Sequence, residues 1–134
     1  MIKAIIVDDE EKGGMALNNL LKKNCANVEV IEICDSVENA VVVINKHNPD
    51  LIFLDIEMPF KNGFALFENF KTPSFEVIFT TAYDHYAIKA IKYSAMDYLL
   101  KPVDTDELIV AVSKVELKIV DLMAKEFSID GLIF

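Results

Sequence analysis

The chain has 134 residues, of which 53% are hydrophobic, so it can build one domain around a single core and has little room for a second. Its net charge is −9 at pH 7, and the sequence pI is about 4.6. This balance argues against direct nucleic-acid binding by this segment, because such binding needs a clustered basic face.

The first half of the chain alternates short apolar runs with apolar residues at helical spacing. Residues 2–7 and 51–54 form compact apolar runs that predict strands, and residues 28–34 predict a further strand. Charges interrupt residues 28–34, which is typical of an edge strand. Between these strands, apolar residues three or four positions apart predict two helices, one with Leu17, Leu20 and Leu21 and one with Val37, Ala40, Val41 and Ile44.

The second half continues the same alternation. A third helix is predicted after Gly63 by aromatic residues three apart, Phe64, Phe67 and Phe70. Residues 77–80 predict the fourth strand and residues 98–100 a short fifth, with a helix between them at Ala87, Ile88, Ile91 and Ala95. The last helix has the clearest start, because Asp104 is a good N-cap with Glu107 three residues on. Its apolar stripe is Leu108, Val112, Val115, Ile119 and Leu122.

Five strands alternating with five helices predict an α/β fold with a doubly wound parallel sheet. The polar second strand belongs at an edge, which favours the flavodoxin-like order 2-1-3-4-5. In that order the functional crevice lies beyond the carboxyl ends of the first and third strands.

Residues able to do chemistry follow the predicted strands at that end of the sheet. Two acids follow the first strand, an acid follows the third, hydroxyls end the fourth, and an amine ends the fifth. These residues are Asp8 and Asp9, Asp55, Thr80 and Thr81, and Lys101. Each has an ordinary role, as a cap or a surface group, but their convergence on one crevice favours a functional site.

The clustered carboxylates need a counter-charge. Two carboxylates about 5 Å apart repel by roughly 3 kcal/mol at an effective dielectric near 20. All-oxygen ligation with room for water suits Mg²⁺, and Mn²⁺ can substitute. An aspartate beside such a cation can act as a nucleophile toward phosphorus. Lys101 can pair with a further phosphoryl oxygen, and a hydroxyl such as Thr81 can donate to one.

Three segments, I-I-V-D-D-E, D-L-I-F-L-D-I-E-M-P-x-x-x-G and Y-L-L-K-P, together with Thr81-Ala82, resemble the signature of response-regulator receiver domains. The resemblance runs from about Ile2 to about Ala124. It implies that Asp55 is the phosphoacceptor, that Lys101 is the family's lysine, usually followed by a cis-proline, and that Mg²⁺ is the cofactor. It implies a signalling switch rather than an enzyme, one that assists only its own phosphotransfer and dephosphorylation.

The resemblance also assigns roles to the residues around Asp55. Asp8 and Asp9 correspond to the metal-binding pair, although which of them contacts the metal through water stays open. Glu57 corresponds to the residue whose backbone carbonyl completes the metal site. Thr81 corresponds to the switch hydroxyl and Tyr98 to the rotating aromatic. Thr80 is a second hydroxyl, but alternation places it on the opposite face of the strand, and it does not directly precede the alanine.

The family resemblance implies partners as well. A histidine kinase would donate the phosphoryl group, and the face made by the fourth helix, fifth strand and fifth helix would rearrange and could form a homodimer. The stretch from Thr80 to Pro102 is similar to receivers joined to LytTR-type DNA-binding outputs, with Tyr83 and Tyr86 at comparable positions. The implied output is therefore transcriptional.

Three other functions agree less well with the sequence. An aspartyl phosphatase would favour a second Asp two residues after the nucleophile, where this chain has Glu57. An unphosphorylated interaction module would not need the complete set of acids, hydroxyl and lysine. Flavin binding suits the fold, but the first strand is not followed by a Ser/Thr/Gly-rich phosphate loop.

Location and domain limits follow from simpler features. Cys25 and Cys34 are too far apart for a CxxC motif and are expected to be reduced thiols. With neither a signal-peptide pattern nor a membrane-length apolar run, we expect a cytoplasmic chain without membrane contact. Residues 1–124 are expected to form the receiver. Residues 125–134 would form a tail or the start of a linker to an absent output domain, with Asp130-Gly131 as a turn or the start of a strand.

Overall fold

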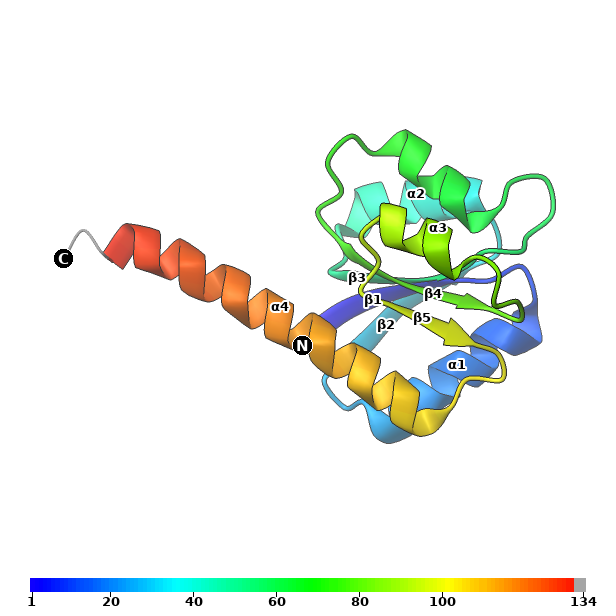
Figure 1. Ribbon diagram of the computed structural model, residues 1–134, viewed down its shortest axis with the longest axis horizontal. Helices are drawn as coiled ribbons and strands as arrows, with labels where there is room; N and C mark the ends of the chain where they lie inside the picture. Colours follow the sequence, from blue (N-terminus) through cyan, green and yellow to red (C-terminus); the bar gives the residue numbers. More distant parts are fainter. Residues whose placement is uncertain (132–134) are drawn as a thin grey trace.

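The computed structural model describes residues 1–131, and their side chains up to residue 125. A parallel sheet of five strands has the order β2-β1-β3-β4-β5, which confirms the predicted fold class (Figure 1). The strands are β1 (Ile2–Val7), β2 (Val28–Cys34), β3 (Leu51–Asp55), β4 (Glu76–Thr81) and β5 (Asp97–Leu100).

Helices cover both faces of this sheet (Figure 1). On one face lie α1 (Glu11–Asn24) and α4 (Thr105–Gly131). On the other lie α2 (Val37–His47), the 3-10 helix η1 (Gly63–Asn69) and α3 (Ala87–Lys92). Each face has its own apolar core, because strand side chains alternate between the two faces.

The burial of the strands agrees with their positions in the sheet. Every residue of the central strand β3 is buried, as expected for a parallel strand covered on both faces. The edge strand β2 has exposed side chains at Glu29 and Glu32, and Cys34 is its one fully buried residue. The prediction that residues 28–34 form an edge strand is therefore confirmed.

The third helix forms where the sequence predicts it, but as a 3-10 helix. In this geometry residues three apart lie on one side of the helix, which fits the three-residue spacing of Phe64 and Phe67. Both rings stack on Tyr93, with centroids 5.2 and 4.6 Å away. A Cβ on Gly63 would lie 2.2 Å from the carbonyl oxygen of Asp55, so only glycine permits this close approach.

The packing face of α3 differs from the apolar pattern in the sequence. Ile88 and Ile91 are 82% and 75% exposed. The inward face is instead made by buried Ala90 with the half-buried rings of Tyr86 and Tyr93. The aromatic rings reach Phe64, whereas the isoleucines lie on the other side of the helix. The helix also ends at Lys92 rather than near Ala95.

The last helix, α4, is longer than predicted. Asp104 caps it, accepting a hydrogen bond from the Glu107 backbone N–H at 3.0 Å, as the sequence indicates. Among the side chains described up to residue 125, Ile119 is the last one packed on the core, and the helix then projects away from the sheet to Gly131 (Figure 1).

The predicted turn or strand at Asp130-Gly131 is wrong, because both residues belong to α4. Residues 120–129 contain neither proline nor glycine, so no residue in that stretch interrupts the helix. Residues 132–134 of the predicted tail lie outside the described part. Within residues 1–131, no helix has the combination of length and hydropathy needed to cross a bilayer.

Candidate functional site

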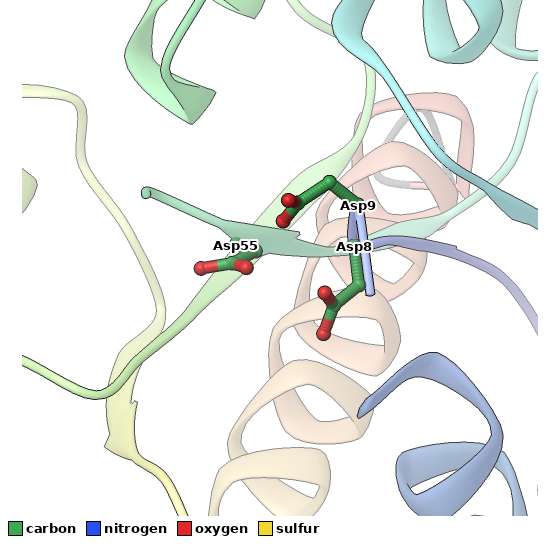
Figure 2. Close-up of side chains that lie close together, drawn as sticks. All are labelled: Asp8, Asp9 and Asp55. Atoms are coloured by element: carbon green, nitrogen blue, oxygen red, sulfur yellow. The ribbon is translucent and has the colours of Figure 1, made fainter. Parts of the chain in front are cut away.

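Three carboxylates meet at the carboxyl ends of β1 and β3 (Figure 2). Asp8 and Asp9 directly follow β1, and Asp55 is the last residue of β3. Each offers an oxygen atom, and these oxygens all lie within 4.8 Å of one another. Asp8 and Asp55 are buried, with only 5% and 4% of their surfaces exposed, while Asp9 is half-buried. The convergence predicted from the strand order is therefore present in the structure.

Lys101 reaches the same site from the end of β5. Its Nζ donates to Asp8 Oδ2 at 2.8 Å and to Asp55 Oδ2 at 3.2 Å. Its backbone N–H donates to the Thr81 carbonyl at 2.7 Å, which fixes the start of the side chain beside β4. The Lys101-Pro102 peptide bond is cis, in agreement with the expectation from the family resemblance.

The electrostatics of the site follow from this packing. Burial raises the pKa of Asp55 to about 6, and the nearby negative charges of Asp8 and Asp9 act in the same direction, while Lys101 partly opposes them. Burial by itself would lower the pKa of Lys101, but its hydrogen bond to Asp8 and the charge of Asp55 outweigh that effect and raise it. Lys101 therefore stays charged, and three ionised carboxylates with one ammonium leave two net negative charges.

This donor set suits a small divalent cation. The ligands are all carboxylate oxygens, which are hard donors of the kind that Mg²⁺ and Mn²⁺ prefer. A charge of +2 would balance the two uncompensated negative charges. The backbone N–H of Glu10 also donates to Asp8 Oδ1 at 2.9 Å, which fixes this side chain at the site.

The two threonines that end β4 face different surroundings. Thr81 is fully buried, and its Oγ1 accepts a hydrogen bond from the Tyr83 backbone N–H at 3.2 Å. Thr80 instead lines a pocket of about 220 Å³ between α1 and the segment that joins β5 to α4, beside Asp8 and Lys101. Their separation agrees with the expected alternation along the strand.

The loop between β4 and α3 carries contacts that sequence reasoning missed. The Tyr98 hydroxyl donates to the backbone carbonyl of Tyr83. The Tyr86 hydroxyl donates to the carboxylate of Glu57, which is exposed two residues after Asp55. Tyr86 and Glu57 are 29 positions apart, and neither spacing nor polarity pairs them. The one sequence signal was the similarity of this loop to receivers with tyrosines at comparable places.

Comparison with known proteins agrees with the fold. Residues 4–113 match the response regulator receiver domain family. Because that match covers most of the chain, the chain belongs to this family, and it is the receiver domain of a two-component response regulator. Receiver domains of this family bind Mg²⁺ in an acidic pocket and interact with histidine kinases.

Particular relatives place the chain more closely. It is 38% identical over 117 residues to the sensory transduction protein LytT of Bacillus anthracis, covering 85% of this chain and 47% of LytT. It is 37% identical over 110 residues to the transcriptional regulatory protein BtsR of Escherichia coli, covering 81% of this chain and 45% of BtsR. Among solved structures, it resembles the receiver domain of AraT, a response regulator from Geobacillus stearothermophilus. That match has a TM-score of 0.81 at 31% identity and covers 91% of this chain and 98% of that one. The chain thus spans about half the length of the curated relatives it matches.

Proposed function

We propose that this receiver is a phosphorylation-activated switch in which Asp55 accepts a phosphoryl group from a histidine kinase in a Mg²⁺-dependent step. One observation carries the proposal. Asp55 lies beside two further aspartates, with acidic oxygens within 4.8 Å of one another, and its Oδ2 is 3.2 Å from the ammonium of Lys101. This arrangement pairs a candidate nucleophile with a cation-binding group and a fixed positive charge.

In the transfer step, a carboxylate oxygen of Asp55 forms a bond to phosphorus as the bond from phosphorus to the kinase histidine nitrogen breaks. The electron pair of the broken bond stays on that nitrogen. Asp8, Asp9, Asp55 and the backbone carbonyl of Glu57 would hold the cation, which when bound neutralises charge on the phosphoryl oxygens. Lys101 stays protonated and pairs with another of these oxygens. In the later dephosphorylation, a water oxygen bonds to phosphorus as the bond from phosphorus to the Asp55 oxygen breaks, which releases phosphate and the free carboxylate. This is the only hydrolysis that the site assists.

The proposed switch works through Thr81 and Tyr98. The Thr81 hydroxyl would leave the Tyr83 N–H and donate to a phosphoryl oxygen, and Tyr98 would follow the movement of the β4–α3 loop. Moving a two-state equilibrium from 1:99 to 99:1 requires about 5.5 kcal/mol of differential interaction. Charge-assisted hydrogen bonds contribute roughly 1.5–3 kcal/mol each, so about two to four new ones would supply this free energy.

We further propose that α3, β5 and α4 form the face that responds and that a second copy can bind there. Each of these elements has an exposed apolar side chain: Ile91 on α3 is 75% exposed, Leu100 at the end of β5 is 43% exposed and Val110 on α4 is 54% exposed. A contiguous exposed apolar patch is typical of a protein interface, whereas single exposed apolar side chains are ordinary, so the proposal requires these three side chains to act together. In the chain α3 directly precedes β5 and α4 directly follows it, and β5 is an edge strand of the sheet, which supports a shared role for the three elements.

The wider setting is also a proposal. Residues 1–124 would be the receiver and residues 125–134 a tail or the start of a linker to an output domain. The relatives LytT and BtsR are about twice as long as their matched parts, and the name of BtsR describes a transcriptional regulator. A transcriptional output on a cytoplasmic protein is therefore proposed, while this segment itself binds neither nucleic acid nor membrane.

Mass spectrometry after incubation with acetyl phosphate and Mg²⁺ tests the central proposal. The wild-type chain should gain one phosphoryl mass, Asp55→Asn should gain none, and the exposed-acid variant Asp106→Asn should behave as wild type. An unmodified wild-type chain that nevertheless binds Mg²⁺ would overturn the proposal. Steady multi-turnover hydrolysis of a generic phosphate ester would support a phosphatase instead.

A further inference from the structure

The hydrogen bond between Tyr86 and Glu57 joins two loops that border the carboxylate cluster. Glu57 lies in the loop after β3, two residues from Asp55. Tyr86 occupies the N-cap position of α3, and its backbone carbonyl accepts from the Ala90 N–H at 3.0 Å. The bond therefore links the metal side of the site to the first turn of a helix on the proposed responding face.

Both ends of this contact are anchored. Ile56, just before Glu57, is fully buried, and its carbonyl accepts from the Gly63 N–H at 2.9 Å. The Tyr86 ring packs against Phe64, with centroids 6.0 Å apart, and against His85 at 4.2 Å. Each end of the hydrogen bond is therefore held in place by contacts of its own. Glu57 itself lies in the loop after β3 and is exposed.

The contact has a chemical consequence as well as a mechanical one. Glu57 is a fourth carboxylate near a cluster that already has two uncompensated negative charges. The Tyr86 hydroxyl, which donates to the Glu57 carboxylate, fixes the position of that negative charge.

We propose that Tyr86 is a positioning residue of the cation site, whose hydroxyl holds the Glu57 side chain and so couples the loop that would bind the cation to the first turn of α3. This inference rests on the proposed role of the Glu57 backbone carbonyl. Thermodynamic linkage makes the coupling reciprocal. Cation binding shifts the first turn of α3, and loss of the hydroxyl weakens cation binding.

Titration of the unphosphorylated, isotope-labelled full chain with MgCl₂ tests this coupling by NMR. In the wild type, the amides of Asp9 and Asp55 and those of α3 should shift with the same dissociation constant. Tyr86→Phe removes the hydroxyl and retains the ring that packs on Phe64. It should raise the Mg²⁺ dissociation constant about threefold to tenfold and at least halve the α3 shifts at saturation.

Two further variants make the test specific. Tyr83→Phe is the matched control, because its hydroxyl donates no hydrogen bond within residues 1–125, and it should titrate as wild type. Glu57→Ala should reproduce the effect of Tyr86→Phe, and the double variant should add nothing to either single change. Because Glu57 is exposed in a loop, this second route stays available if Tyr86→Phe folds poorly.

The outcomes separate this inference from the proposed function. If the wild type shows no Mg²⁺-dependent shifts at Asp9 and Asp55, both proposals fail. If the wild type binds Mg²⁺ and Tyr86→Phe keeps the dissociation constant within twofold, the positioning role of Tyr86 is overturned and the phosphoacceptor proposal stands. Additive effects of Tyr86→Phe and Glu57→Ala would likewise overturn the coupling.

Discussion

At the scale of single residues, Asp55 loses most of its contact with water on folding, and burial raises its pKa from 3.8 to about 6. The folded chain therefore holds this proton more tightly than the unfolded chain does. As the pH rises from about 4 through about 6, ionisation of Asp55 favours unfolding by up to about 3 kcal/mol. The charge that would serve as nucleophile is thus a source of instability in the cation-free protein.

We expect Asp55→Asn to raise the free energy of unfolding by about 1–3 kcal/mol at pH 7.5 without divalent cations, and by less than about 1 kcal/mol at pH 4.0. Asparagine does not ionise, and Lys101 retains its contact with Asp8. Urea denaturation in EDTA at the two pH values measures the difference. A stability gain that is equal at both pH values, or also present in Asp106→Asn, would contradict the desolvation argument.

Gly13 contacts the site more closely than its place in α1 suggests. A Cβ at this position would lie 2.6 Å from Asp8 Oδ2, the atom that accepts from Lys101. Gly13→Ala gains about 1 kcal/mol of helix propensity, but it must displace the Asp8 carboxylate. We expect the free energy of unfolding to stay within about 1 kcal/mol of wild type and the Mg²⁺ dissociation constant to rise about tenfold.

Calorimetric titration with Mg²⁺ measures the change in affinity, and urea denaturation measures the change in the free energy of unfolding. Gly14→Ala is the contrasting variant, because its Cβ would meet Ile33 Cγ2 at 2.8 Å and is 3.9 Å from Asp8. It should lose stability and keep its Mg²⁺ affinity. Unchanged Mg²⁺ affinity in Gly13→Ala would show that the Asp8 carboxylate can move without cost.

Sequence reasoning located the main site residues for a physical reason. The carboxyl ends of parallel strands meet at one edge, so acids after β1 and β3 and a lysine after β5 had to converge. The contact between Tyr86 and Glu57 was not predictable in that way. It joins two loops, and loop conformation depends on contacts such as that of Tyr86 with Phe64, which no local pattern specifies.

At the scale of elements, the start of α4 depends on one side chain. Asp104 Oδ2 accepts from the Glu107 backbone N–H, which satisfies a donor that the helix leaves without an internal partner. We expect Asp104→Ala to lower the free energy of unfolding by about 1 kcal/mol. Urea denaturation measures this loss, and Asp106→Asn should stay within about 0.5 kcal/mol of wild type. If Asp104→Ala and wild type had equal free energies of unfolding, the cap would make no contribution to the stability of the chain.

The elements also show where sequence periodicity is informative and where it is not. The pattern was sufficient for β1 and β3, which are almost uninterrupted apolar runs, and for the buried stripe of α4, which repeats over several turns, because such patterns must face a core. It was insufficient for η1 and α3, which are seven and six residues long. In such short elements one aromatic contact can decide the geometry. Tyr93 packs on both Phe64 and Phe67, and this fixes which side of α3 faces inward.

At the scale of the whole molecule, residues 120–125 of α4 contribute little to the core. Residues 120–125 of α4 are exposed, whereas Val115 is fully buried. A chain ending at Ala124 should therefore keep its free energy of unfolding within about 0.5 kcal/mol of the full chain. Val115→Ala should lose about 2 kcal/mol. Urea denaturation of both proteins checks this domain limit, and a marked loss in the shortened chain would contradict it.

The projecting part of α4 gives the molecule a lever. Residues 120–131 continue the helix beyond its last contact with the core, over a length of about 18 Å at 1.5 Å per residue. A change of about 10° in the direction of α4 at the sheet would displace the far end of that segment by about 3 Å. Side chains at the base of the helix need move by only a fraction of that distance. A small change in the angle of α4 at the sheet would therefore displace the far end of the helix by about the length of a hydrogen bond, without a change in any other element.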